Sequence, residues 1–127
     1  IFTTQENVKP LGHSIECRIN AENSEDFKPS AGTIGLFHPP AGNGIRLDTF
    51  IYSGYKVPHY YDNLLAKLIA TGRTRNHAIK RALRSLNEIV IDGIETNIEL
   101  HKKILSSKDF KEGSVSINWL ENNIASL

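Results

Sequence analysis

The chain has 127 residues, of which 39% are hydrophobic and 23% charged, with 15 lysines and arginines against 14 aspartates and glutamates. These values predict one globular domain and give no support to a disordered chain or a coiled coil. The net charge of +1 provides no strong field for nucleic acid, and no apolar run approaches the roughly 20 residues that span a bilayer. Cys17 is the single cysteine, so no disulfide can form within the chain, which favours a reducing compartment such as the cytoplasm.

The chain contains no methionine and begins at Ile1. Because a full-length product normally begins with an initiator methionine, we expect an excised fragment of a longer protein, with further residues before Ile1.

The first predicted element is a strand over residues 13–20, in which apolar and polar side chains alternate. Because successive side chains of a strand point to opposite faces, we expect Ile15, Cys17 and Ile19 in the core. Glu16 and Arg18 then project together from the other face. Their spacing alone predicts an ordinary surface ion pair.

Three further strands are expected between residues 33 and 70. The polar stretch 22–32 predicts a loop, and the strands 33–37 and 45–52 predict an antiparallel hairpin with a long tip. Asn43 and Gly44 are expected to supply positive φ angles at that tip. The apolar run 64–70, which ends at Gly72, is short enough to favour a buried strand over a helix.

From Thr74 the apolar residues follow a helical period, at Ala78, Ile79, Ala82, Leu83, Leu86, Ile89 and Val90. Thr74 or Asn76 is the expected N-cap, and Gly93 the expected end. A second helix is expected over residues 97–105, and a third from Ser116, with Ile117, Leu120 and Ile124 as its apolar positions. Strands followed by helices predict a single α+β domain over residues 1–127, an antiparallel sheet packed with about three helices.

Patterns for metal, phosphate or nucleophile chemistry are weak. The five histidines include no i,i+4 pair and no Cys-x-x-Cys lies beside them, so no metal site is expected. Gly42 and Gly44 lack the third glycine and the following helix of a phosphate loop, and Ser114 does not lie in a nucleophile elbow. The basic residues of the predicted long helix favour a solvated face over nucleic-acid binding, which stays a weaker alternative carried by Arg75, Lys80, Arg81 and Arg84.

The run from Gly12 to Glu22, GHSIECRINAE, resembles the signature that opens the C-terminal domain of biotin carboxylases. Further segments follow in the order and spacing of that family, and together they cover essentially the whole chain. The bacterial acetyl-CoA carboxylase type is the most similar. The matching segments are Pro29, Ser30, 32–34, 37–39, 44–46, Tyr52, Gly54, Tyr55, Val57, Pro58, Tyr60, Tyr61, Asp62, 67–69, 91–94, Thr96, Asn97, Phe110 and Gly113.

The resemblance implies part of an ATP-dependent ligase that carboxylates biotin on its carrier protein with bicarbonate, the first half-reaction of acetyl-CoA carboxylase in fatty acid synthesis. Carboxyltransferase subunits and the biotin carboxyl carrier protein are the implied partners. The ATP-grasp portion, which in this family binds ATP and Mg²⁺ and supplies the base, precedes this segment. No cofactor is therefore expected within the fragment, which we expect to be inactive alone.

The resemblance also assigns residues. Arg18 matches the family arginine that contacts bicarbonate and the biotin ureido group. Arg46 and Asp62 match positions associated with a homodimer contact, and Asn43 stands where some relatives have an aromatic residue, which puts the strength of the dimer in question. The alternative is a non-catalytic dimerisation or partner-binding module, in which Arg18 forms only a structural ion pair.

Overall fold

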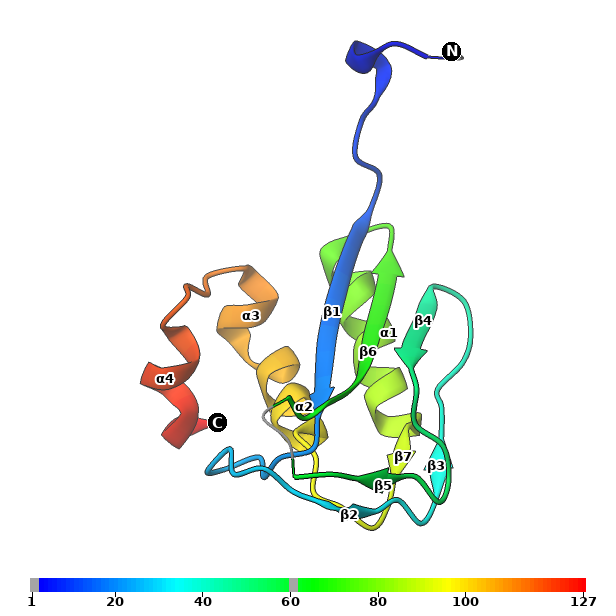
Figure 1. The fold of residues 1–127 in the computed structure, drawn as a ribbon. Helices are drawn as coiled ribbons and strands as arrows, with labels where there is room; N and C mark the ends of the chain where they lie inside the picture. Colours follow the sequence, from blue (N-terminus) through cyan, green and yellow to red (C-terminus); the bar gives the residue numbers. More distant parts are fainter. Residues whose placement is uncertain (1–2, 60–61) are drawn as a thin grey trace.

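Figure 1 shows the computed structural model, which describes residues 3–59 and 62–127. Tyr60 and Tyr61 of the family motif lie outside the described residues. A short 3-10 turn, Gln5–Asn7, precedes the first strand. Within the described ranges, no helix is long and apolar enough to cross a membrane.

A three-stranded antiparallel sheet forms the centre of the fold, in the order β1 (His13–Asn20), β6 (Leu64–Gly72), β4 (Ile45–Thr49). Helix α1 (Arg75–Glu88) packs along one face of this sheet (Figure 1). The alternation of β1 is as expected, because Ile15, Cys17 and Ile19 are buried. The main core lies between sheet and helix, and it includes Ile19, Leu68, Ala70, Ala78, Ile79, Ala82 and Leu86.

Two short strand pairs form a second part of the fold. β2 (Gly32–Thr33) pairs with β5 (Lys56–Val57), and β3 (Phe37–His38) pairs with β7 (Val90–Ile91). They surround a smaller core of Ala21, Ile34, Ile51, Val57 and Leu65.

The expected hairpin between residues 33–37 and 45–52 is therefore wrong. The 45–49 strand pairs with β6, with Leu47 opposite the fully buried Leu68, because β6 is long enough to form a ladder and β3 is only two residues long. In the intervening turn Gly42 and Gly44 have φ angles of 119° and 72°, so a glycine takes the position that we expected Asn43 to occupy.

The sequence predicted where the helices begin more closely than where they end. Thr74 caps α1, since its hydroxyl accepts a hydrogen bond from the His77 amide at 3.2 Å. The helix ends at Glu88, about a turn before Gly93, because Val90 and Ile91 extend to form β7. Helix α2 (Ile98–Ser106) matches the second expected helix.

The C-terminal region departs further from expectation. Helix α3 (Lys108–Glu112) was not expected; Ser107 caps it and Gly113 ends it with a φ of 74°. The third expected helix is α4 (Trp119–Asn123), followed by a 3-10 turn, Ile124–Ser126. Ile117 lies outside it and is 98% exposed. With α3 added, the described residues form four α-helices where about three were expected.

The Cys17 thiol lies in the core, 2% exposed. Burial, and to a smaller degree the Glu16 charge, raises the pKa of Cys17 to about 12. Since the thiolate is the reactive form, we expect the folded chain to resist Ellman's reagent at neutral pH and to react at once in guanidinium chloride. Rapid labelling under native conditions would show that this strand is not held in the core.

Candidate functional site

The sheet face opposite α1 carries the charged side chains of all three strands. In the strand register Arg18 lies opposite Lys67, and Lys67 lies opposite Asp48. Two residues further along β6, on the same face, Ile69 lies between Glu16 on β1 and Arg46 on β4. We call these six residues the open sheet face. The arrangement follows from the two-residue period, which sends the neighbours Cys17, Leu68 and Leu47 to the core.

Arg18 projects from β1 with 65% of its side chain exposed. Its Nε donates to Oε1 of Glu16 at 3.0 Å, so the ion pair that the spacing predicted is present. Such an exposed pair adds little stability, but it does orient the guanidinium. Because the pair uses Nε, both Nη groups are without a protein hydrogen-bond partner among residues 3–59 and 62–127, and they can bind an oxyanion as a fork.

Arg46 lies on β4 and forms a two-pronged ion pair within its own strand. Its Nε and Nη2 donate to the two carboxylate oxygens of Asp48, each at 2.8 Å. Side-chain hydrogen bonding from Arg46 is the main reason why the pKa of Asp48 is lowered. Asn43 is exposed in the turn before β4.

Asp62 lies away from Arg46, just before the other end of β6. Its Oδ1 accepts a hydrogen bond from the Leu64 amide at 3.0 Å and so starts the strand. The structure therefore brings Asn43 and Arg46 to one end of the sheet and leaves Asp62 at the opposite end.

Three arginines of the basic segment at α1 make contacts inside the molecule. Arg75 donates to the Phe110 carbonyl at 2.7 Å and lies over its ring at 4.7 Å. Arg81 donates to the Thr71 carbonyl at 2.6 Å, and Arg84 to the Ala41 carbonyl at 3.0 Å. These guanidinium groups hold loops and a neighbouring helix in place, so contacts within the fold explain these three arginines better than nucleic-acid binding does.

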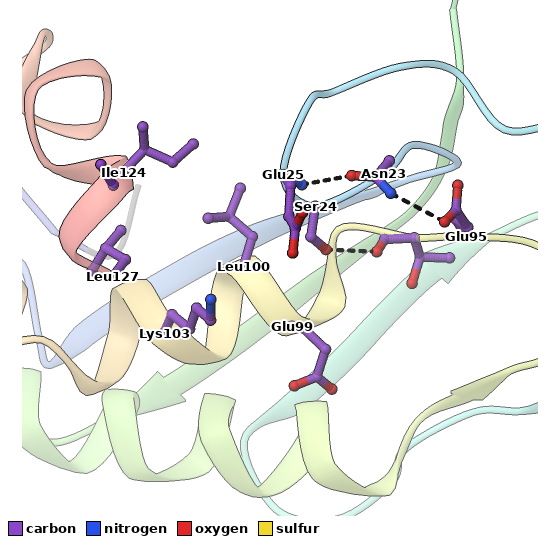
Figure 2. A pocket seen from close by; sticks show the side chains of 11 residues that line it. Asn23, Ser24, Glu25, Glu95, Glu99, Leu100, Lys103, Ile124 and Leu127 are labelled. Carbon is purple, nitrogen blue, oxygen red and sulfur yellow. Dashed lines mark hydrogen bonds between the residues drawn. The ribbon is translucent and has the colours of Figure 1, made fainter.

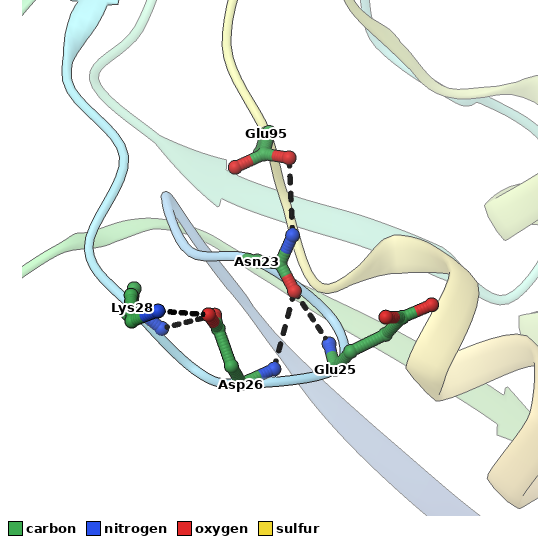
Figure 3. Close-up of polar contacts among 5 residues, drawn as sticks. All are labelled: Asn23, Glu25, Asp26, Lys28 and Glu95. Carbon is green, nitrogen blue, oxygen red and sulfur yellow. Dashed lines mark hydrogen bonds and ion pairs between the residues drawn. The ribbon is translucent and has the colours of Figure 1, made fainter.

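The loop that follows β1 is closely hydrogen-bonded (Figure 3). The Asn23 side chain accepts from the amides of Glu25 and Asp26, at 2.7 and 3.2 Å, and donates to Glu95 at 3.0 Å. The Ser24 hydroxyl donates to the Thr96 carbonyl at 3.0 Å. These bonds attach the loop after β1 to the segment that leads into α2.

A hollow of about 630 Å³ lies beside this loop, between the start of α2 and the C-terminal residues (Figure 2). Its lining combines the carboxylates Glu25, Glu95 and Glu99 with the apolar side chains Leu100 and Ile124. Arg18 does not line it, so the arginine of the family motif and this hollow are separate features.

Sequence reasoning missed a group of polar residues around the backbone of Arg18. Asn97 and His101, from α2 and its N-cap, both reach the Arg18 carbonyl, at 3.0 and 2.8 Å. The family pattern was the available signal for this group, because its matching segments contain Asn20, Glu22 and Asn97. Within the described ranges there is no group of three His, Cys, Asp or Glu side chains placed to hold a metal ion.

His101 is partly buried, and burial is the main cause that lowers its pKa below the ordinary value of 6.5. As the pH falls, the unfolded chain takes up this proton before the folded chain does, so the free energy of unfolding decreases. His101→Gln is expected to weaken that decrease between about pH 7.5 and about pH 5.5 in urea titrations. Parallel curves for the two proteins would contradict this assignment.

The fold and the motif residues define one class of protein, and comparison with known proteins identifies it. A family model described as "Biotin carboxylase C-terminal domain" matches residues 16–122. The chain belongs to this family.

Relatives and solved structures agree. The biotin carboxylase of Haemophilus influenzae is 48% identical over 120 residues, 94% of this chain and 27% of that protein. Biotin carboxylase 1 of Bacillus subtilis is 49% identical over 118 residues, which are 92% of this chain and 26% of that protein. The chain thus spans about a quarter of the length of these relatives.

Among solved structures, a biotin carboxylase from Campylobacter jejuni has a TM-score of 0.90 at 39% identity, covering 96% of this chain and 27% of that one. The biotin carboxylase domain dimer of the Hydrogenobacter thermophilus 2-oxoglutarate carboxylase, in complex with MgADP, ADP and bicarbonate, has a TM-score of 0.92 at 38% identity, covering 98% and 28%. The domain fold is therefore shared almost over its full length.

Proposed function

We propose that residues 1–127 are the C-terminal domain of an ATP-dependent biotin carboxylase and that Arg18 contacts the reacting groups. The observation that carries this proposal is the combination of family membership with an exposed arginine, on a rigid strand, whose Nη groups face no protein partner in the described part of the chain. The substrates are bicarbonate and the biotin of a carrier protein.

The chemistry of the side chain supports this role. Removing the proton from the ureido nitrogen of biotin places negative charge on the ureido oxygen. A planar guanidinium stabilises that charge by directing its N–H donors at the single ureido oxygen, and it binds two oxygens of the planar bicarbonate anion through parallel hydrogen bonds. Glu16 holds the Nε edge, which leaves the Nη edge for the substrate.

ATP and Mg²⁺ belong to an ATP-grasp part that precedes this domain in the parent enzyme. No step that involves them is assigned to residues of this chain. Arg18 acts only on the bicarbonate and biotin side of the reaction, so the isolated domain is inactive and needs the preceding part to complete the active site.

The parent is an acetyl-CoA carboxylase component that works in the cytoplasm with the carrier protein and carboxyltransferase subunits, in fatty acid synthesis. The support for the acetyl-CoA carboxylase type is that bacterial relatives named biotin carboxylase are 44–49% identical, whereas a pyruvate carboxylase subunit of Methanothermobacter thermautotrophicus is 40% identical.

The test is an assay of the full-length parent enzyme with ATP, Mg²⁺, radiolabelled bicarbonate and free biotin. We expect ADP release that depends on both biotin and bicarbonate, and label in carboxybiotin. ADP release that is the same without biotin, with no labelled carboxybiotin, would remove the proposal and favour the binding-module alternative.

The domain also contributes to a homodimer through Arg46 and Asn43 at one end of the sheet and Asp62 at the other. Arg46 is 71% exposed although it is paired with Asp48, so its guanidinium remains accessible to a partner carboxylate. The related domain from Hydrogenobacter thermophilus was solved as a dimer.

The double substitution Arg46→Ala with Asp62→Ala in the parent enzyme is expected to halve the mass measured by light scattering, because it removes the charge at both proposed contact positions. Lys80→Ala, at an exposed position on α1, is the matched control and should leave the mass unchanged. An unaltered dimer in the double variant would exclude these residues from the interface. Loss of the dimer with full carboxylation would separate the interface from catalysis.

A further inference from the structure

β1 is an edge strand of the three-stranded sheet, so the backbone of Arg18 has a ladder partner on one side only. On the other side the Asn97 side chain takes the place of a neighbouring peptide group. Its Nδ2 donates to the Arg18 carbonyl at 3.0 Å, and its Oδ1 accepts from the Asn20 amide at 2.9 Å. Asn97 is only 5% exposed, so these bonds are shielded from water.

His101 adds a second bond to the same carbonyl. Its Nε2 lies 2.8 Å from the Arg18 oxygen. Since a carbonyl can only accept, Nε2 carries the proton and the ring donates. Asn97 and His101 are one helical turn apart at the start of α2, so the helix holds the Arg18 peptide through two donors.

On the β6 side, the strand ladder becomes irregular between Ile19 and Asn20. Just after this point a second asparagine, Asn63, bonds to the chain. The backbone carbonyl of Asn63 accepts a hydrogen bond from the Ala21 amide at 2.8 Å, and the side-chain Nδ2 of Asn63 donates to the Ala21 carbonyl at 3.1 Å. We call Asn63 and Asn97 the asparagine bracket, because they hold opposite edges of the chain where β1 ends, Asn97 at Arg18 and Asn20 and Asn63 at Ala21.

Glu22 joins the two halves of this bracket. One of its oxygens accepts from Asn63 Nδ2 at 3.1 Å, and the other lies 3.4 Å from Asn97 Nδ2. Glu22 closes the family signature that contains Arg18, and Asn97 lies about 75 residues away in a separate matching segment. The two segments thus meet at the backbone of Arg18.

We infer that Asn97 is a positioning residue for Arg18, fixing the strand from which the guanidinium projects; this inference rests on the proposed function. The guanidinium lies on a long, largely exposed side chain, so its aim depends on the Glu16 pair and on the position of its backbone. A misplacement of about 1 Å at a reacting centre can lower a rate about 100-fold. The bracket prevents such a shift without touching the substrate.

The experiment uses the full-length parent enzyme and a double-mutant cycle of Arg18→Ala and Asn97→Ala. In the wild-type background Asn97→Ala is expected to lower kcat for biotin carboxylation between about 10-fold and about 100-fold per folded molecule, with the KM for ATP unchanged. In the Arg18→Ala background the same substitution is expected to have no further effect, because Asn97 acts through Arg18. Equal losses in both backgrounds would overturn the inference.

Asn97→Leu guards against a variant that does not fold, because its side chain has nearly the same shape and buries no charge, while it loses both hydrogen bonds to β1. It is expected to show the same loss and the same non-additivity; wild-type kcat would overturn the inference. Asn123→Ala is the matched control, since Asn123 also donates to a backbone carbonyl, that of Trp119 in α4. If the wild-type enzyme carboxylates no biotin, the proposed function fails. If the wild type is active, Arg18→Ala is impaired and Asn97→Ala is not, only the inference fails.

Discussion

Replacing Arg18 by lysine in the full-length parent enzyme is expected to lower the rate of biotin carboxylation about 100-fold and to leave the affinity for ATP unchanged. Lysine keeps the positive charge but loses the planar fork that binds two oxygens at once. Loss of one preorganised donor to a developing oxyanion typically costs about 100-fold to about 1000-fold in kcat. ATP binds in the part of the enzyme that precedes this domain, so its dissociation constant should not move.

The measurements are steady-state carboxylation of free biotin and direct titration with a fluorescent ATP analogue. Arg73→Lys is the matched control, because Arg73 is an exposed arginine just before α1 and has no assigned role. If Arg18→Lys carboxylates biotin at the wild-type rate, the guanidinium is not needed and Arg18 is only half of an ion pair. If ATP binding weakens as much as carboxylation, the residue supports folding rather than this step.

Leu68→Ala is expected to reduce the free energy of unfolding by about 3–5 kcal/mol. Leu68 is fully buried in the central strand β6, opposite Cys17 on β1 and Leu47 on β4. Truncation leaves a cavity that the two flanking strands and α1 cannot fill without breaking their own contacts. A loss of this size is a large part of the total stability of a typical domain.

Urea titration of the isolated 127-residue chain measures this effect. Leu11→Ala is the control, because Leu11 is 93% exposed and should change stability by less than about 0.5 kcal/mol. A loss below about 1 kcal/mol for Leu68→Ala would mean that the sheet is not packed on α1 in solution.

The sequence predicted the elements whose signal is local. The alternation of Ile15, Cys17 and Ile19 predicted β1 and its buried face, and the helical period after Thr74 predicted both α1 and its cap. Each of these follows from residues within a few positions of one another. The α+β class followed from such elements taken in order, whereas the family followed from the resemblance of the motif segments that begin with residues 12–22; both are confirmed.

The strand pairing could not be predicted in this way. β3 pairs with β7 across about 50 residues of chain, and two-residue strands have no period that could indicate a partner. The predicted end of α1 was wrong for the same reason. Ile89 and Val90 continue the helical pattern, but pairing with β3 extends the chain at Val90. Tertiary contacts there override the local preference.

The candidate site was predicted only in part. Periodicity placed Arg18 on the exposed face next to Glu16, and the family motif supplied its proposed role. The bonds from Asn97 and His101 join positions about 80 residues apart, and they depend on how α2 meets the edge of β1. Polar side chains at such distances leave no spacing in the sequence that would indicate their meeting.

A crystal structure of the full-length parent enzyme with bicarbonate and biotin bound would test the central claim most directly. We expect the Nη groups of Arg18 within about 3 Å of oxygens of bicarbonate or of the biotin ureido group, with the Asn97 amide still donating to the Arg18 carbonyl. Both ligands bound at a site that Arg18 does not reach, with its guanidinium paired only to Glu16, would contradict the proposed role.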